Sequence, residues 1–332
     1  MKRSLVAALV CPISSDPLEL DSDGDEVESG MLTCGGCGFE WPVRDGIPRL
    51  VPPDLVEQQR QTASAFGWQW QHFSEMHDEF EAQFLDWLDP ITPEFFGRKR
   101  VLDAGCGTGR HSYFAASYGA AEVMALDLSA AVEAAKDNLA AFDNVHVVQG
   151  DLLRLPFWRP EDGGGFDFVY SIGVLHHLPE PAEGFRNLVR YVRPGGTIAV
   201  WVYGYENNGF VRNVVEPLRR ISTRVPPSLL RGLAWPLGAG FHGAAKLLYR
   251  PLRGTAVGRS LPLNEYMASV AGFSFRQNYG IVFDQLAAPT AAYITGPELA
   301  GWFADAGLED IQISHRHGNS WRGRGRVPAR AG

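Results

Sequence analysis

Residues 101–111 read Val101-Leu102-Asp103-Ala104-Gly105-Cys106-Gly107-Thr108-Gly109-Arg110-His111. The apolar start predicts a buried strand, the glycines predict a turn, and the polar residues that follow predict the beginning of a helix. Glycines at such a turn remove Cβ atoms, so that backbone N–H groups reach a ligand near the helix N-terminus. This stretch therefore predicts a nucleotide-like ligand site in an α/β protein.

The pattern of a strand followed by an acid recurs along the chain. Asp103, Asp127 and Asp151 each follow an apolar run, at equal spacings of 24 residues. That spacing is the length of a strand, a crossover helix and a second strand, which is the repeat of a parallel sheet. Ligands of open α/β sheets bind at the carboxyl ends of the strands. The sequence therefore predicts a doubly wound sheet that brings three carboxylates to one edge.

The three acids match the chemistry of S-adenosylmethionine. Asp127 offers acceptors for both ribose hydroxyls, Asp151 for the adenine amino group, and Asp103 for the ammonium of the methionine tail, directly or through water. A pyrophosphate dinucleotide matches less well, because Arg110 stands at the third glycine of G-x-G-x-x-G and Asp103 would repel phosphate. Another nucleotide-binding Rossmann domain is the alternative.

Residues 98–203 resemble the class I S-adenosylmethionine-dependent methyltransferases that carry the Asp-Ala-Gly-Cys-Gly-Thr-Gly turn. The resemblance implies a Rossmann-like, doubly wound sheet of seven strands. It extends to Val174-Leu175-His176-His177-Leu178 and to Val192-Arg193-Pro194-Gly195-Gly196-Thr197, the latter expected as a tight turn into a fifth strand, Ile198 to Val202. The cofactor residues that it implies are Asp103, Gly105, Cys106, Gly107, Gly109, Asp127, Leu128, Asp151, Leu152 and Ser171.

The chain after the fifth strand departs from the family pattern. The helix and β-hairpin that normally complete the sheet are expected only at residues 295–332, where Thr295-Gly296-Pro297-Glu298 opens a helix and Gly307 ends it. Residues 204–294 are then an insertion over the carboxyl edge, which we interpret as a mainly helical substrate cap. The stretch 205–260 holds nine basic residues against two acids. We favour a cap helix with a solvated basic face, with an anionic substrate or peripheral membrane contact as alternatives.

Residues 1–53 are expected to form a small β ribbon with apolar runs at Leu5 to Val10, Met31 to Thr33 and Ile47 to Val51. The stretch from Leu9-Val10-Cys11-Pro12 through Cys34-Gly35-Gly36-Cys37 to Pro42-Val43-Arg44-Asp45-Gly46-Ile47-Pro48 resembles the Trm112-like family of zinc ribbons. That family includes members that lost cysteines and keep the fold without metal. Ser14 stands where the second cysteine is expected, and structural zinc sites need four ligands. A metal-free ribbon is favoured over zinc held by Cys11, Cys34, Cys37 and an unidentified fourth ligand.

Residues 54–97 are expected to be a helical connector between the ribbon and the sheet. Apolar residues from Phe80 to Leu88 recur at three- and four-residue spacing, and Pro90 ends that helix. The aromatic stretch Phe66-Gly67-Trp68-Gln69-Trp70 is interpreted as core packing rather than ligand contact, because large aromatic side chains are mostly buried for hydrophobic reasons.

The composition excludes several classes of protein. With 45% hydrophobic residues and 20% charged residues, the 332-residue chain is not wholly disordered. A net charge of −8 argues against a general polyanion binder, DNA included. Four cysteines fit a reducing compartment, no apolar run is long enough for a transmembrane segment, and residues 1–11 do not fit a lipoprotein signal. We expect a cytoplasmic location, and the sequence leaves the oligomeric state open.

The expected function is methyl transfer from S-adenosylmethionine to a small-molecule acceptor, such as a natural-product, saccharide or lipid-like intermediate. If the acceptor has a proton to lose, His177 is the catalytic residue we assign, with His176, Asp284 and Tyr293 as further candidates for a general base. Cys106 is expected to pack in the turn rather than act as a nucleophile. A tRNA or protein methyltransferase and a non-catalytic cofactor-binding scaffold are the alternative functions.

Overall fold

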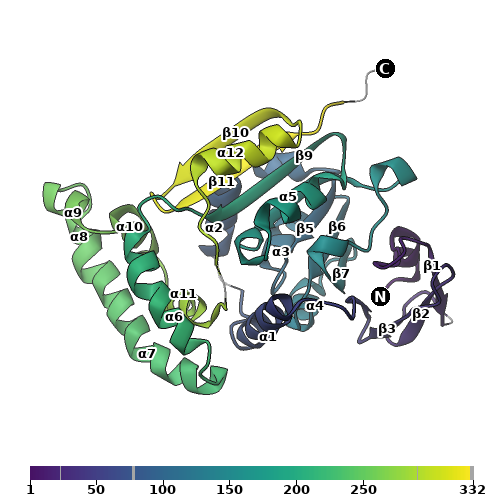
Figure 1. Cartoon of the computed structure of the whole chain (residues 1–332), viewed down its shortest axis with the longest axis horizontal. Helices are drawn as coiled ribbons and strands as arrows, with labels where there is room; N and C mark the ends of the chain where they lie inside the picture. The colour runs from purple at the N-terminus through teal and green to yellow at the C-terminus, as the bar shows by residue number, and fades with distance from the viewer. Residues whose placement is uncertain (23, 77–78, 290, 330–332) are drawn as a thin grey trace.

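One continuous sheet of eleven strands runs through the computed structural model, which describes residues 1–22, 24–76, 79–289 and 291–329 (Figure 1). Its strands are β1 (Leu18–Asp21), β2 (Gly30–Cys34), β3 (Glu40–Arg44), β4 (Ile47–Leu50), β5 (Arg100–Ala104), β6 (Glu122–Asp127), β7 (Val145–Gly150), β8 (Phe166–Ile172), β9 (Val192–Tyr203), β10 (Glu309–Arg316) and β11 (Ser320–Arg326).

Seven of these strands form the central part of the sheet, in the order β7-β6-β5-β8-β9-β11-β10. The first five are parallel, and β11 pairs antiparallel with both β9 and β10. The chain thus winds outward in both directions from β5, the strand that precedes the glycine turn. The predicted Rossmann-like, doubly wound fold class is confirmed.

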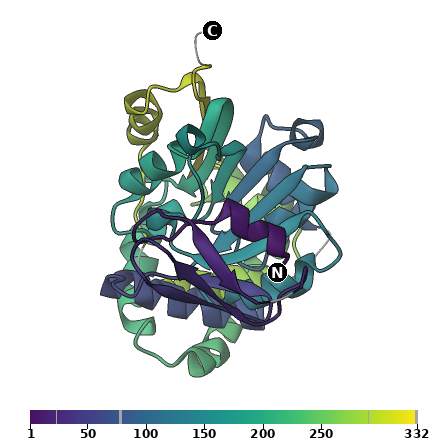
Figure 2. The same ribbon diagram turned by 90° about the vertical axis from the view of Figure 1, so that its right-hand side faces the viewer.

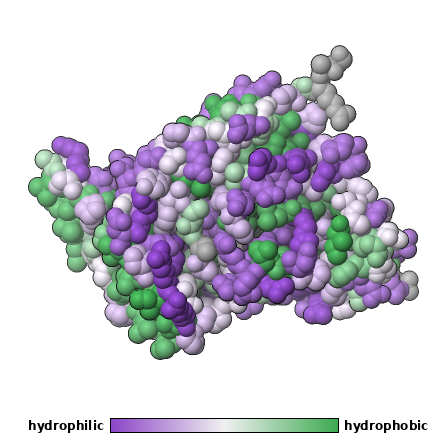
Figure 3. Space-filling view, viewed as in Figure 1, coloured by the Kyte–Doolittle hydropathy of each residue, from purple (hydrophilic) through white to green (hydrophobic). Residues whose placement is uncertain are grey.

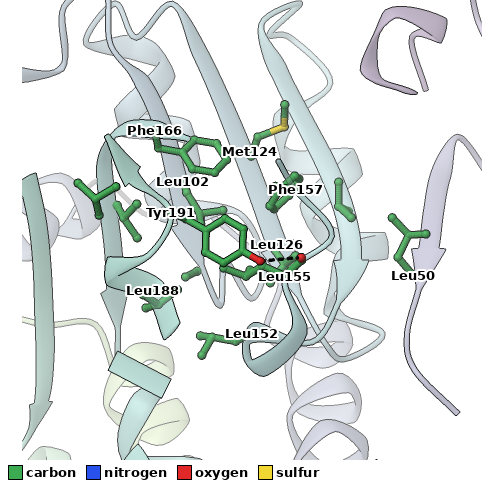
Figure 4. Close-up of a cluster of buried hydrophobic side chains, with 14 of the residues drawn as sticks. Leu50, Leu102, Met124, Leu126, Leu152, Leu155, Phe157, Phe166, Leu188 and Tyr191 are labelled. Atoms are coloured by element: carbon green, nitrogen blue, oxygen red, sulfur yellow. Dashed lines mark hydrogen bonds between the residues drawn. The ribbon is translucent and has the colours of Figure 1, made fainter. Parts of the chain in front are cut away.

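Helices cover both faces of the central sheet. Val101 packs in the cluster under α2 and α3 on one face, and its neighbour Leu102 packs in the cluster under α5 and α12 on the other, as the alternation of strand side chains requires. Figure 4 shows part of the second cluster, where the Tyr191 hydroxyl donates to the Leu155 carbonyl at 3.2 Å. The helices outside the cap are η1 (Arg3–Ala8), α1 (Glu57–His72), α2 (Glu79–Leu88), η2 (Pro93–Phe96), α3 (Arg110–Ser117), α4 (Ala131–Leu139), η3 (Leu152–Arg154), η4 (Pro160–Asp162), η5 (Leu175–His177), α5 (Pro181–Val189) and α12 (Gly296–Asp305).

The N-terminal ribbon joins the central sheet edge to edge, beside β7 (Figure 2). Strand β4 pairs in parallel with β7, with Arg49 opposite Gln149 and Leu50 opposite Gly150. The expectation of a strand at Leu5 to Val10 is wrong, because most of this run forms the 3-10 helix η1. Leu5 and Leu9 are buried four residues apart, and periodicity in so short an apolar run does not separate strand from helix.

Strand β9 also differs from its prediction. The stretch Val192 to Thr197, expected as a tight turn, already belongs to the strand. Phe166 pairs with Val192 and Phe168 pairs with Thr197, so the intervening residues of β9 bulge out of the ladder, with Gly195 at a φ of 80°. The glycine therefore allows an irregularity inside the strand rather than a separate turn.

Residues 204–294 form a helical layer beside the carboxyl ends of the strands, which we call the cap. Its two ends meet at the sheet, where the Ile294 N–H donates to the Tyr203 carbonyl at 2.9 Å and the Tyr205 N–H donates to the Ile294 carbonyl at 2.9 Å. No helix in the described ranges is long and apolar enough to cross a membrane. The cap helices are η6 (Val211–Val215), α6 (Glu216–Ser222), α7 (Pro227–Ala244), η7 (Ala245–Tyr249), α8 (Arg250–Leu252), α9 (Ala256–Ser260), α10 (Asn264–Val270) and α11 (Phe275–Ala287).

Candidate active site

A cavity of about 630 Å³ lies between the carboxyl ends of the parallel strands and the cap. Its floor includes Gly105, Asp127 and Asp151, which follow or end β5, β6 and β7. Phe241 of α7 and Asp284 of α11 belong to the opposite wall. The cavity thus joins the predicted cofactor edge to the cap.

The glycine turn is fixed by backbone geometry that only glycine tolerates well. Gly105 has a φ of 97°, and a Cβ atom there would overlap the Val174 side chain. The N–H groups of Gly105 and Cys106 donate to the Leu126 carbonyl at 2.8 and 2.9 Å. The turn is thereby tied to the end of β6. Gly109, at a φ of 77°, is the N-cap residue of α3 and is not part of the cavity lining.

Asp127 ends β6 and links the glycine turn to the cavity. Its Oδ2 accepts the Gly107 N–H at 2.9 Å, and its Oδ1 accepts the Ser129 N–H at 2.8 Å and the Ser129 hydroxyl at 2.6 Å. Burial raises the pKa of this carboxyl group. A carboxylate offers about four lone pairs, so a further donor from the cavity can still be accepted. Leu128 lies beside it in the cavity wall.

Asp151 follows β7 and is almost fully buried. It accepts the Leu153 N–H at 2.9 Å, and the Gln59 amide of α1 donates to its two oxygens at 3.2 and 3.1 Å. Burial raises its pKa as well. Gln59 was not predicted from the sequence, because it belongs to no recognisable motif and a single glutamine in a polar stretch does not indicate a ligand site. Leu152 also lines the cavity.

Asp103 and Ser171 lie behind the cavity surface rather than in its lining. Asp103 is fully buried and accepts the Ser112 hydroxyl at 2.7 Å, and burial raises its pKa to about 7. The Ser171 hydroxyl donates to the Ala104 carbonyl at 2.8 Å, below the glycine turn. Cys106 lines the cavity, but burial raises the pKa of its thiol, which suits a packing residue more than a nucleophile.

Helix α1 contributes aromatic side chains to the cavity. Phe66 and Trp70 line it, and Trp68 packs against Phe283 of the cap with ring centroids 5.5 Å apart. The interpretation of this aromatic stretch as core packing alone is therefore wrong for Phe66 and Trp70. Both are partly exposed to the cavity, which the strong hydrophobicity of aromatic residues could not reveal from the sequence.

Arg110, the first residue of α3, brings a cation to the cavity wall. Its guanidinium carbon lies 4.9 to 5.6 Å from the ring centroids of Trp70, Phe80 and Trp87. Its Nε donates to His111 Nε2 at 3.2 Å, and no ion pair with an acid forms within the described ranges. Burial lowers the pKa of Arg110 to about 10, so it stays charged at neutral pH. A guanidinium cation surrounded by three aromatic rings at the cavity wall suits a carboxylate ligand.

His177 lines the cavity from η5. Its ring contacts Phe66 edge-on, with centroids 4.9 Å apart, and lies 5.9 Å from the Tyr203 ring. His176 points away from the cavity lining and stacks on Tyr203 at 3.9 Å, and burial lowers its pKa well below the usual value. His176 is thus held neutral inside the protein, whereas His177 faces the cavity.

A hydrogen-bonded network joins the cap to the sheet at the same wall. The Tyr203 hydroxyl donates to Asp284 Oδ2 at 3.2 Å, and the Gln69 amide of α1 donates to Asp284 Oδ1 at 3.1 Å. Gln285 donates to the Tyr203 hydroxyl at 3.1 Å. Burial raises the pKa of Tyr203 well above its usual value. Tyr203 was missed by the sequence analysis, although its place at the carboxyl end of a parallel strand was a usable signal.

The ribbon brings three thiols together. Cys11 Sγ lies 3.6 Å from Cys37 Sγ, and the sulfur atoms of Cys11, Cys34 and Cys37 all lie within 4.8 Å of one another. The Ser14 hydroxyl lies 3.3 Å from Cys34 Sγ, at the place of a fourth ligand. Burial tends to raise the pKa of Cys34, but hydrogen bonds from Ser14 and the Cys37 backbone outweigh it and lower the pKa to about 7. The donor set matches three quarters of a zinc site.

Two family models match this chain. Residues 101–196 match the model described as a methyltransferase domain, and residues 2–46 match the Trm112p-like protein model. The first covers the glycine turn and the three acids, and the second covers the three clustered thiols. Both resemblances that the sequence suggested are confirmed.

Curated relatives match the central part of the chain. A chloroplastic tocopherol O-methyltransferase of Arabidopsis thaliana is 32% identical over 36% of this chain and 34% of its own length. A malonyl-[acyl-carrier protein] O-methyltransferase of Enterobacter lignolyticus is 35% identical over 45% of this chain and 55% of its own length. The chain thus spans about a third to a half of these relatives.

Solved structures resemble the chain more loosely. Magnesium protoporphyrin IX methyltransferase from Synechocystis, with bound S-adenosylmethionine, covers 83% of this chain and all of its own, at 14% identity and a TM-score of 0.45.

Proposed function

We propose, from the premise that this chain combines a methyltransferase domain with a Trm112p-like segment, that it transfers a methyl group from S-adenosylmethionine to a small molecule. The observation that carries the proposal is the position of Asp127 and Asp151 on one cavity floor, beside a glycine turn that Asp127 itself holds. Two carboxylates there, Asp151 buried and Asp127 half-buried, suit a ligand that is rich in donors, and a pyrophosphate would be repelled.

The cofactor would be held by residues that already line the cavity or support it. Asp127 would accept the ribose hydroxyls, Asp151 the adenine amino group, and Leu128 and Leu152 would pack on the adenine. Arg110 would pair with the carboxylate of the methionine tail, and Asp103 would act behind the turn, through water or through Ser112. Gly105, Cys106, Gly107 and Gly109 would shape the turn, and Ser171 would support it from below. When bound, this cofactor supplies an electrophilic methyl group on a sulfonium.

The acceptor side of the cavity would be formed by His177, Tyr203 and Asp284. His177 is our candidate for the general base, because an imidazole at the cavity wall suits the acceptance of a proton from a hydroxyl or an amine. Asp284 is the second candidate, held by Gln69 and Tyr203 through its two oxygens. The surrounding aromatic rings would exclude water and align the acceptor, which methyl transfer requires more than it requires a base.

The choice of a small acceptor rests on the cavity itself. It lies under the cap and is lined by many apolar side chains, which suits an acceptor with a substantial apolar part. A tRNA or protein acceptor is the second candidate, favoured by the Trm112p-like match. The presence of all three acids and of the glycines of the turn argues against a non-catalytic scaffold. The free state of all four cysteines agrees with the proposed cytoplasmic location.

Transfer of a labelled methyl group tests the proposal. We expect isotopically labelled S-adenosylmethionine to label a low-molecular-weight fraction of a cell extract, and the Asp284→Asn and His177→Ala variants to separate the two base candidates by their loss of turnover. Label that appears only in RNA or protein would support the second candidate. Tight binding without transfer to any fraction would support the scaffold.

A further inference from the structure

The outer surface of the cap carries an apolar stripe that none of the described residues covers. Helices α7, η7 and α8 follow one another from residue 227 to residue 252, and only a narrow strip of α7, including Leu230 and Ala234, is buried against α11. Leu229 and Leu233 remain 57% and 54% exposed, and Leu247 is 82% exposed. Figure 3 shows hydrophobic surface along these helices. A monomeric protein in water rarely leaves so many leucines on one element unpartnered.

The stripe continues into the cavity. Phe210 directly precedes η6, and Leu218 lies in α6. Each of the two side chains is 51% exposed, and both line the cavity. Leu237 of α7 does the same at 56% exposure. An apolar molecule on the outer surface therefore meets hydrophobic side chains all the way to the acceptor side of the site.

The same surface is strongly basic. Residues 217–264 contain no aspartate or glutamate, although the whole chain has a net charge of −8. None of the exposed cations of this segment forms an ion pair with an acid in the described part of the chain. These cations are Arg220, Arg224, Arg231, Lys246, Arg250, Arg253 and Arg259.

The combination of exposed leucines with unpaired cations favours a lipid bilayer over a second copy of this chain as the partner of this surface. A second copy of this chain would pair the surface with itself, and a two-fold interface would then bring unpaired arginines against one another. A bilayer that contains anionic lipids accepts leucine and tryptophan side chains into its interfacial region and attracts Lys and Arg to its headgroups. Trp235, 55% exposed on α7, is a residue type that favours this boundary.

We propose that the outer surface of α6, α7, η7 and α8 docks on an anionic lipid bilayer and turns the acceptor side of the cavity toward it. The docking builds on the proposed function, and it assigns the acceptor to the class of lipid-soluble amphiphiles that partition into the bilayer. Only the surface of the cap enters the interface, and the cofactor edge of the sheet stays in water.

Co-sedimentation of the full chain with vesicles tests the docking without any methyl transfer. We expect binding to vesicles of phosphatidylcholine with 30% phosphatidylglycerol, and weak binding to phosphatidylcholine alone. The difference is expected because each Lys or Arg near an anionic surface strengthens binding. Leu229→Gln, Leu233→Gln and Leu247→Gln together should lower the partition coefficient roughly 100-fold. Arg224→Gln, Lys246→Gln and Arg250→Gln together should lower it about as much, on anionic vesicles only.

Matched controls lie elsewhere on the surface. Ile13→Gln with Ile311→Gln changes side chains that are 46% and 38% exposed, and Arg44→Gln with Arg186→Gln removes exposed cations. Both control variants should bind vesicles as the unchanged chain does. Calorimetry with S-adenosylmethionine on each sample reports the cofactor site, so a failure of the proposed function is distinguishable from a failure of docking.

Three results would overturn the proposal. The first is no binding of the unchanged chain to anionic vesicles, and the second is equal binding by the leucine variant and its control. The third is a dimer in analytical ultracentrifugation that the leucine variant converts to monomer, which would assign the stripe to a second copy of the chain.

Discussion

The single residue Asp127 both holds the glycine turn and lines the cavity. It holds the turn through the Gly107 N–H, and its remaining lone pairs face the cavity. We expect Asp127→Ala to weaken S-adenosylmethionine binding by about 1.5 to 3 kcal/mol, the loss typical of hydrogen bonds to a charged group. Isothermal titration calorimetry measures it, with Asp143→Ala, a change at a fully exposed acid, as the control. Unchanged affinity would remove the ribose assignment.

Asp103 makes the stability of the ligand-free chain depend on pH. Burial raises its pKa from 3.8 to about 7, so the folded chain holds a proton between these values that the unfolded chain has lost. This contribution to stability is full below about pH 4 and is lost as the pH rises toward 7.

The variant Asp103→Asn lacks the titrating group and should lack this loss. Urea unfolding at pH 5, 6, 7 and 8 should therefore show the free energy of unfolding of the variant gaining on that of the unchanged chain as the pH rises. Parallel pH profiles for the two proteins would contradict the assignment of the raised pKa to Asp103.

The central elements could be predicted because each carries a local signal. The strands around Asp103, Asp127 and Asp151 are short buried runs that end in an acid, and their order follows from the connections between parallel strands. Gln59 could not be predicted in this way, because it reaches the cavity only through the packing of α1, and such a long-range contact leaves no periodic pattern in the sequence. Tyr203 was missed although it ends β9, and the carboxyl end of a parallel strand is a usable signal.

The ribbon element is predicted to fold without stoichiometric zinc. Cys11 and Cys34 are buried in a cluster with Trp41 and Leu50 that continues into the central sheet, so the ribbon has a hydrophobic core without a metal. A serine hydroxyl is also a poor replacement for a thiolate. Elemental analysis of the purified chain should find well below one zinc per molecule, and circular dichroism should not change with a chelator. One tightly held zinc per chain would show this to be wrong.

The cap element is predicted to serve the acceptor rather than the cofactor. Deleting Asn207 to Ser274 and closing the gap with a short Gly/Ser linker keeps α11, and with it the contact of Gln69 with Asp284. Cofactor affinity should fall little, because Asp127 and Asp151 lie outside the deleted part, while transfer to the acceptor should be lost. A folded deletion variant that no longer binds the cofactor would place the cap in the cofactor site.

At the scale of the whole molecule, the ribbon and the methyltransferase domain share one sheet and one core. Beyond the pairing of β4 with β7, the Val10 N–H donates to the Pro156 carbonyl at 3.0 Å and Arg49 pairs with Glu133 at 2.7 Å. We expect the two to unfold together, in one calorimetric transition. A second transition at lower temperature, absent when residues 1–46 are removed, would show that the ribbon melts on its own.

The meeting of the two cap ends at Tyr203 and Ile294 has a consequence for how such a chain can diversify. Both ends of the cap are hydrogen-bonded to each other at the end of β9, and the entropic cost of closing a loop grows only slowly with its length. The sheet can therefore tolerate caps of different lengths between these two ends. A length of chain attached in this way can be exchanged like a cassette. Selectivity for new acceptors can then evolve, or be engineered by transplanting a foreign segment between the two anchors, while the inherited cofactor machinery is left untouched.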